Sequence, residues 1–211
     1  SFSADGRRLV LTHARAASAK GAKADLYIVD TDAAAKARTV TAFGNRAVAI
    51  GNDRVLGMDD GTLLDLDTGR PVTPLALRVA TVRAGWIERS RLLWTATADG
   101  RLLFWDPTDG ALQLTMHMLP GNRFFAVAPG GRYDTNLDAD SALVRWMVPD
   151  APWQSLSAQT FMRDYYEPGL YRRLLDCRAN GTCDSAFKAL PAIASLNRVL
   201  PRTRITGVRP G

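Results

Sequence analysis

The side chains best suited to covalent chemistry in this sequence are two cysteines, Cys177 and Cys183, and two histidines, His13 and His117. A cysteine nucleophile needs a base close to its thiol, so a thiol hydrolase would need one of these cysteines beside one of these histidines. The sequence has no Gly-x-Ser-x-Gly turn, no phosphate-binding glycine-rich loop and no His-x-x-x-His pair. We therefore expect no catalytic residue, no cofactor and no metal in this chain.

The two cysteines are separated by five residues that include the turn dipeptide Asn180-Gly181. Two cysteines with no histidine nearby cannot supply the four ligands of a structural zinc site. A turn between them could close a small disulfide loop, and the alternative is two separate thiols. A disulfide would indicate a periplasmic or secreted protein, whereas free thiols would favour the cytoplasm.

Three acidic residues, Asp134, Asp138 and Asp140, gather in one segment and raise the question of calcium binding. Their spacing lacks the regular ligand pattern of an EF-hand, so a polar hairpin tip is the favoured interpretation.

Four aromatic residues near the C-terminus raise the question of a ligand platform. At helical spacing we expect them to pack against the edge of a sheet instead. They are Phe161, Tyr165, Tyr166 and Tyr171.

The elements that would position these residues are short strands over the first 150 residues. Alternating apolar runs end at Asp, Gly, Asn or Pro, and four Asp-Gly pairs (Asp5-Gly6, Asp60-Gly61, Asp99-Gly100 and Asp109-Gly110) mark tight turns. Corresponding strand ends fall at residues 30, 67, 106 and 147, at steps of about 40 residues. A repeat of this length that holds four short strands is typical of a β-propeller blade.

Two of these units resemble the WD40 repeat. The segment from Gly100 to Trp105-Asp106 is similar to the end of such a repeat, and Phe2–Val10 is similar to its opening. Unit two has Leu66 where tryptophan is usual, and unit four has Trp146-Met147. No unit has the Gly-His dipeptide, so the Asp-His-Ser/Thr-Trp hydrogen-bond network of ideal blades is expected to be absent. The predicted blade-end residues are Asp67, Trp105, Asp106 and Trp146.

The predicted fold is thus all-β, with about four WD40-type blades over residues 1–156 and a short α-helical tail over residues 157–200. An open arc of four blades would leave two apolar faces exposed, so we expect further blades before Ser1 or a second chain at the ends. Residues 13–24 are predicted to be a long exposed hairpin loop. Residues 201–211 are predicted to be a linker or the first strand of a following domain.

The tail is predicted to contain three helical pieces. In the first, Ser157 caps the start while Phe161, Met162 and Tyr165 share one face. Pro168 breaks this piece and is placed at the first turn of a second helix, which ends near residues 177–180 and carries an apolar stripe. A third piece is expected over residues 185–190, and residues 191–200 are left open as a short helix or an extended edge. The stripe of the second helix consists of Leu170, Tyr171, Leu174 and Leu175.

Several segments are similar to the end of the WD40 region in bacterial caspase-family proteins. They are residues 124–134, 143–146, 161–170 and 194–198, and the resemblance covers about residues 86–208. In that family the tail joins the propeller to further domains, including a caspase-like (C14) cysteine peptidase. The resemblance implies a scaffold or sensor module beside a protease. It does not imply protease activity here, because neither histidine is followed by glycine and neither cysteine lies in a Gln-Ala-Cys motif.

Composition favours a globular protein whose charge is unevenly placed. The 211 residues are 46% hydrophobic with a net charge of +6, and no apolar run reaches the length of a membrane span. Residues 157–211 carry nine Lys and Arg against four acidic residues. We expect a protein or peptide partner, or other domains of the parent chain, and no membrane partner. Nucleic-acid binding through the arginine-rich tail is the weakest of the hypotheses, since a solvated helical face explains the same charges.

Overall fold

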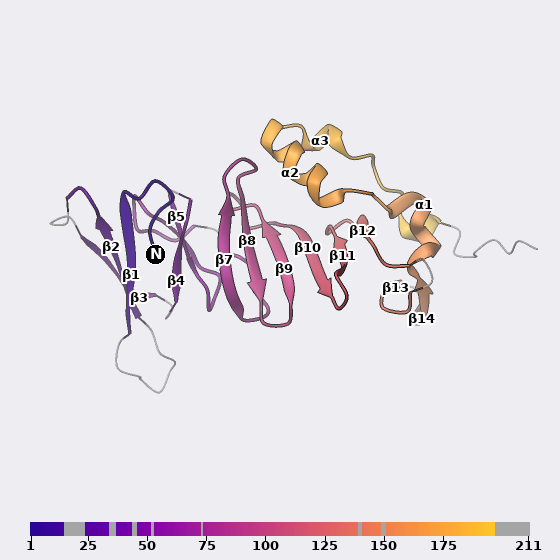
Figure 1. Ribbon diagram of the computed structural model, residues 1–211, viewed down its shortest axis with the longest axis horizontal. Coiled ribbons are helices and arrows are strands. Elements are labelled where there is room, and N and C mark those ends of the chain that lie inside the picture. Colours follow the sequence, from indigo (N-terminus) through magenta and orange to yellow (C-terminus); the bar gives the residue numbers. More distant parts are fainter. Residues whose placement is uncertain are drawn as a thin grey trace, which may run out of the picture.

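The computed structural model describes residues 1–14, 24–33, 37–43, 46–51, 53–72, 74–138, 141–148 and 151–196. Antiparallel β-sheet is the main regular structure of the described chain, and a short helical tail follows it. The sheets stand in a row along the long axis of the molecule, in sequence order (Figure 1). Residues 15–23 of the expected loop and the expected strand after residue 200 lie outside the described residues.

The first two sheets each have three strands in sequence order. The first contains β1 (Arg8–Ala14), β2 (Ala24–Asp30) and β3 (Arg38–Phe43), and the second contains β4 (Ala47–Ile50), β5 (Arg54–Gly57) and β6 (Leu63–Asp65). The glycines of all four Asp-Gly pairs have positive φ angles, between 70° and 83°. This is the conformation that tight turns require and that glycine adopts without steric cost.

The third sheet is a continuous six-stranded meander. It contains β7 (Thr81–Ile87), β8 (Leu92–Thr97), β9 (Arg101–Trp105), β10 (Leu112–Leu119), β11 (Arg123–Val127) and β12 (Tyr133–Thr135). A blade would end at β10, but a tight turn with positive φ at Gly121 and Asn122 folds β11 back onto it. The predicted boundary between units three and four is therefore absent, and β13 (Arg145–Val148) forms a separate hairpin with β14 (Ala151–Ser157).

The second sheet buries both of its faces, because successive residues of a strand point to opposite sides. Val55 packs with Val10, Leu26 and Ile28 of the first sheet. The next residue, Leu56, packs on the other side in a cluster that includes Leu93, Leu103 and Trp105 of the third sheet. The second sheet is thus stacked between its two neighbours.

The tail covers the opposite face of the third sheet. Its elements are η2 (Ala158–Phe161), α1 (Met162–Tyr165), α2 (Leu170–Asn180), α3 (Cys183–Ala186) and η3 (Ile193–Ser195). Leu170 and Leu174 of α2 pack with Leu92, Phe104 and Leu114 of the sheet. Figure 1 shows α2 and α3 lying along this sheet. None of the described helices has the length and apolar character needed to cross a membrane.

Details of the tail differ from the sequence prediction. Ser157 makes no side-chain cap, and the helical segment that follows it begins as a 3₁₀ turn. Met162 is 40% exposed rather than on the buried face. Pro168 lies before α2, whose N-cap is Gly169 in the left-handed conformation. The third helix begins at Cys183, two residues earlier than predicted, and ends at Ala186 instead of residue 190.

Candidate functional site

Three strands end in the same aspartate turn. The side chains of Asp30, Asp65 and Asp106 each accept a hydrogen bond from the backbone N–H two residues later. Asp65 and Asp106 also make the same pattern of backbone hydrogen bonds. The carbonyl of each aspartate accepts from the N–H of the glycine four residues later, Gly69 or Gly110. The N–H of each aspartate donates to the carbonyl of the residue five positions later. In both turns Oδ1 of the aspartate is used by the turn itself, and Oδ2 remains available for a further partner. We call the turns at Asp65 and Asp106 the two aspartate sockets.

This geometry corrects the predicted register of unit two. Asp65, not Asp67, is the structural equivalent of Asp106, and the residue in the tryptophan position is Leu64 rather than Leu66. The sequence Asp65-Leu66-Asp67 allowed both alignments, and the prediction took the one that ends at Asp67. The strand ends therefore fall at residues 30, 65 and 106.

The sequence predicted that the Asp-His-Ser/Thr-Trp hydrogen-bond network would be absent, but a Trp–Thr bond of that kind is present. The indole Nε1 of Trp105 on β9 donates to Thr95 Oγ1 on β8 at 2.9 Å, and both residues are buried. The expectation was wrong for this link, because it needs only a threonine on the neighbouring strand and no histidine. Trp146 makes a different contact: its Nε1 donates to the Ala158 carbonyl at 3.3 Å, so it anchors the start of the tail.

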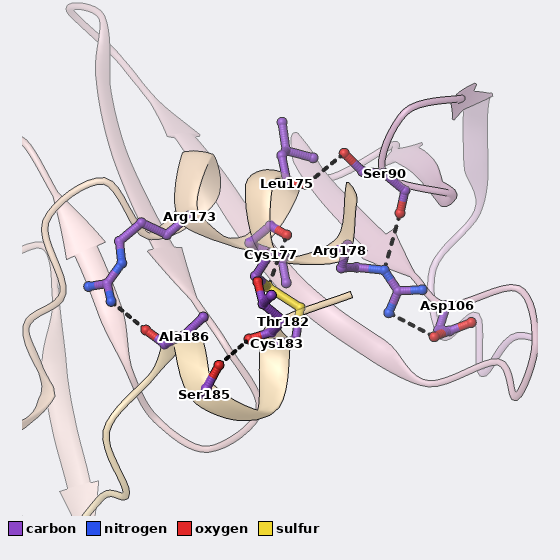
Figure 2. Close-up of a disulfide and its surroundings, with 11 residues drawn as sticks. Ser90, Asp106, Arg173, Leu175, Cys177, Arg178, Thr182, Cys183, Ser185 and Ala186 are labelled. Atoms are coloured by element: carbon purple, nitrogen blue, oxygen red, sulfur yellow. Dashed lines mark hydrogen bonds and ion pairs between the residues drawn. A yellow bond between two sulfur atoms is a disulfide. The ribbon is translucent and has the colours of Figure 1, made fainter. Parts of the chain in front are cut away.

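The Asp106 socket is filled by the tail. Arg178, near the end of α2, places its Nη1 2.7 Å from Asp106 Oδ2, and its Nε donates to the Ser90 carbonyl at 3.2 Å. Ser90 Oγ in turn donates to the Leu175 carbonyl at 3.0 Å, as Figure 2 shows. Burial alone would raise the pKa of Asp106, but the Thr108 N–H and the Arg178 guanidinium lower that pKa below its ordinary value.

A disulfide between Cys177 and Cys183 closes a short loop that begins next to Arg178. The sulfur atoms of Cys177 and Cys183 are 2.00 Å apart, and the Cα atoms are 4.7 Å apart (Figure 2). Gly181 ends α2 in the left-handed conformation, which turns the chain back toward Cys177. Cys177 itself is buried against the sheet. Both thiols are consumed by this bond, so neither is a free nucleophile.

A cleft of about 610 Å³ opens beside Arg178, where units two and three meet the tail. Four arginines line it, together with two acidic residues, the Trp86 indole and the turn after β9. Arg54 is engaged by Asp65 at 2.9 Å and by Asp53 at 3.1 Å. The full lining is Asp53, Arg54, Trp86, Glu88, Arg89, Arg91, Pro107, Thr108 and Arg178.

Sequence reasoning missed the cleft. Arg54, Arg89 and Arg91 come from two separate hairpins, and Arg178 lies about 90 residues further along the chain. The only local signal was the Arg89-Ser90-Arg91 triplet in the turn between β7 and β8. It places two cations on either side of a serine that proves to be 2% exposed.

Asp134 and the aromatic run have structural roles. Asp134 is buried, and its Oδ2 accepts from the Gly169 N–H at 3.0 Å, while Asp140 lies outside the described residues. No group of three or more His, Cys, Asp or Glu in the described part of the chain could hold a metal. The ring of Tyr171 packs on Phe104. The other three aromatics join a cluster with Tyr133, namely Phe161, Tyr165 and Tyr166.

The remaining titratable residues are dispersed. His13 is on β1 and His117 on β10, where burial first and Arg101 second lower the pKa of His117. The arginines of α2 are engaged by acidic partners rather than forming a continuous cationic track. Arg172 pairs with Asp176, Arg173 with Glu167, and Arg178 with Asp106.

No family model and no curated protein matches the chain. Among solved structures, it is similar to the computationally designed Ika4 protein, with 16% sequence identity and a TM-score of 0.36. That match covers 59% of this chain and 89% of the designed one.

Proposed function

We propose that this chain is a non-catalytic protein-interaction module whose first three stacked units are WD40-type blades. Three features support the proposal: the burial of both faces of the second sheet, the recurring aspartate turn, and the Trp105–Thr95 bond. The first sheet leaves Phe2 and Leu11 exposed, which accords with further blades or a partner chain on that side.

The observation that carries the binding function is the cleft beside Arg178. It is formed by two neighbouring units and is bordered by the tail, so it depends on the assembled fold and not on a single loop. Its volume lies within the range of about 300–1,000 Å³ that is typical of ligand-binding clefts. Polar side chains of both signs and one indole line it, a mixture suited to a protein or peptide partner.

We further propose that the module is the accessory propeller of a larger caspase-like peptidase protein. The four segments that carry this resemblance contribute to one apolar cluster, through Phe125, Tyr133, Trp146, Tyr165 and Leu196. Their association in space favours a common structural unit over four chance likenesses. The disulfide favours an oxidising compartment, periplasmic or extracellular. The parent sequence after Gly211 tests this part: absence of His-Gly and Gln-Ala-Cys elements would refute it.

The interaction function is tested by site-specific photo-crosslinking in the cells that naturally make the protein. A photoreactive amino acid replaces Thr108, which is exposed in the cleft, and in a matched variant it replaces Val82, which is exposed elsewhere on the third sheet. We expect a defined crosslinked protein species from position 108 that is absent from position 82. Failure to obtain any species from position 108, or identical species from both positions, would refute the cleft as the interaction site.

A further inference from the structure

We propose that the cleft beside Arg178 binds an acidic peptide segment of the partner, held by Arg89 and Arg91. The inference rests on the proposed interaction function and specifies the chemistry of the partner. Of the four arginines that line the cleft, Arg54 and Arg178 already have carboxylate partners within the chain. Arg89 and Arg91 have no such partner among the described residues, and both are exposed.

The turn that carries these two arginines is held in place by the tail. Ser90, between them, is 2% exposed; its hydroxyl donates to Leu175 and its carbonyl accepts from Arg178. Both flanking side chains therefore project from a backbone that is fixed before any ligand arrives. Fixing the binding groups in advance reduces the ordering cost of association.

Arg91 has a backbone conformation that opposes its residue type. Its φ angle is +49°, in the left-handed region that favours glycine or asparagine. Such a position gives a tighter turn at a local cost, and glycine there would form the same turn with less strain. A long cationic side chain at this position is accounted for if it contacts a ligand.

The other residues of the cleft favour a peptide over a nucleic-acid backbone. Asp53 and Glu88 share the lining with the arginines, so a continuous row of phosphates would meet like charges. The Trp86 Nε1 donates to Glu88 Oε2 at 2.6 Å, which holds an apolar ring beside the cations. Guanidinium groups next to an aromatic surface suit a segment in which Asp or Glu alternates with apolar residues.

Selection from a random dodecapeptide phage library tests the proposal on the whole disulfide-bonded chain. Selections are run on the wild type, on the R89E/R91E variant, and on a control variant R83E/R172E with the same net charge. Arg83 and Arg172 are exposed and lie outside the cleft lining. Circular dichroism and the unfolding temperature establish that all three proteins are folded, and fluorescence anisotropy measures binding of the selected peptides.

We expect the wild type and the control to enrich peptides with clustered Asp and Glu. Binding of those peptides to R89E/R91E should be at least tenfold weaker than to the wild type. Replacement of Glu by Gln in the peptides should weaken binding to the wild type by at least as much. Enrichment of peptides without acidic bias would overturn the proposed chemistry but leave an interaction module standing. Recovery of no peptide would overturn the proposal, and photo-crosslinking would then decide whether the interaction function also fails. Equal binding by R89E/R91E, or displacement by single-stranded DNA at lower concentration than by free peptide, would also overturn it.

Discussion

Asp65 and Asp106 occupy the same turn in neighbouring units but have different cationic partners. Asp65 pairs with Arg54, which lies opposite it on the adjacent strand. The corresponding position beside Asp106 is held by Leu92, one residue beyond the Leu93–Trp105 pair, and Leu92 is buried under the tail. The cation for Asp106 therefore comes from α2, in the form of Arg178. Each unit supplies the same aspartate turn. Where the adjacent strand has Leu92 instead of an arginine, the free carboxylate oxygen binds a cation from a distant segment.

The two units also differ in what covers them. The second sheet has another sheet on each face, whereas the third has a sheet on one face and the tail on the other. An open arc of blades was expected to leave an apolar face uncovered at each end. The tail covers that face at the C-terminal side, so in this region a helix takes the place that a further blade would occupy.

Removal of an apolar contact from α2 should have the largest effect. Leu174 is buried against Phe104 and Leu114, and Leu174→Ala should destabilise the fold by about 3 kcal/mol through lost burial and the cavity left behind. Urea unfolding measures the change. Leu175→Ala is the matched control, because Leu175 is only half-buried and should cost clearly less. Equal losses in the two variants would mean that α2 is not held by its buried stripe.

Opening the disulfide should have the next largest effect. The bond joins residues six positions apart, and a loop of this size restricts the unfolded chain by about 2 kcal/mol. In a Cys177→Ala/Cys183→Ala variant, hydrogen exchange should become faster than in the wild type, and the increase should be larger in residues 170–180 than in residues 92–105. Reductant should lower the unfolding temperature of the wild type and leave the variant unchanged. A reductant response in the variant, or an intact mass showing two free thiols in the wild type, would contradict this.

The two sockets can be compared directly by double-mutant cycles. Asp106→Asn with Arg178→Gln, and Asp65→Asn with Arg54→Gln, should each give a coupling energy of about 1 kcal/mol, as expected for partly buried pairs. Only the first cycle should increase exchange in α2, because only Asp106 is bound to the tail. Equal exchange in α2 from both cycles would show that the sockets do not differ as the structure indicates.

How far the sequence could predict this molecule depended on the range of the interaction. Strand positions, Asp-Gly turns and the apolar stripe of α2 are set by neighbours in sequence, and they were largely predicted. The register of unit two failed because Asp65 and Asp67 are two residues apart in a pattern of period two. The continuation from β10 to β11 depended on the left-handed Asn122, and the Arg178–Asp106 pair joins residues 72 positions apart. No local pattern encodes such a pairing.

Acidification should have the smallest effect, because it changes only the protonation of the two socket aspartates, Asp65 and Asp106. Hydrogen bonds and an arginine outweigh burial and lower the pKa of both Asp65 and Asp106 below the ordinary 3.8. Because the folded-state pKa is the lower one, the stabilisation is fully present above pH 3.8. It is lost as the pH falls through the folded-state value. At neutral pH, therefore, neither pair should be sensitive to pH.

The Nε–H resonance of Arg178, followed by NMR from pH 7 to pH 2.5, should report this loss for Asp106 alone. We expect a midpoint below 3.8 in the wild type and in Asp65→Asn, where the tail socket is intact. The same resonance should not titrate in Asp106→Asn, since the amide keeps its charge state. A midpoint above 3.8, or an unchanged titration in Asp106→Asn, would mean that another group controls the docking of α2. The tail would then no longer be the counterpart of Arg54.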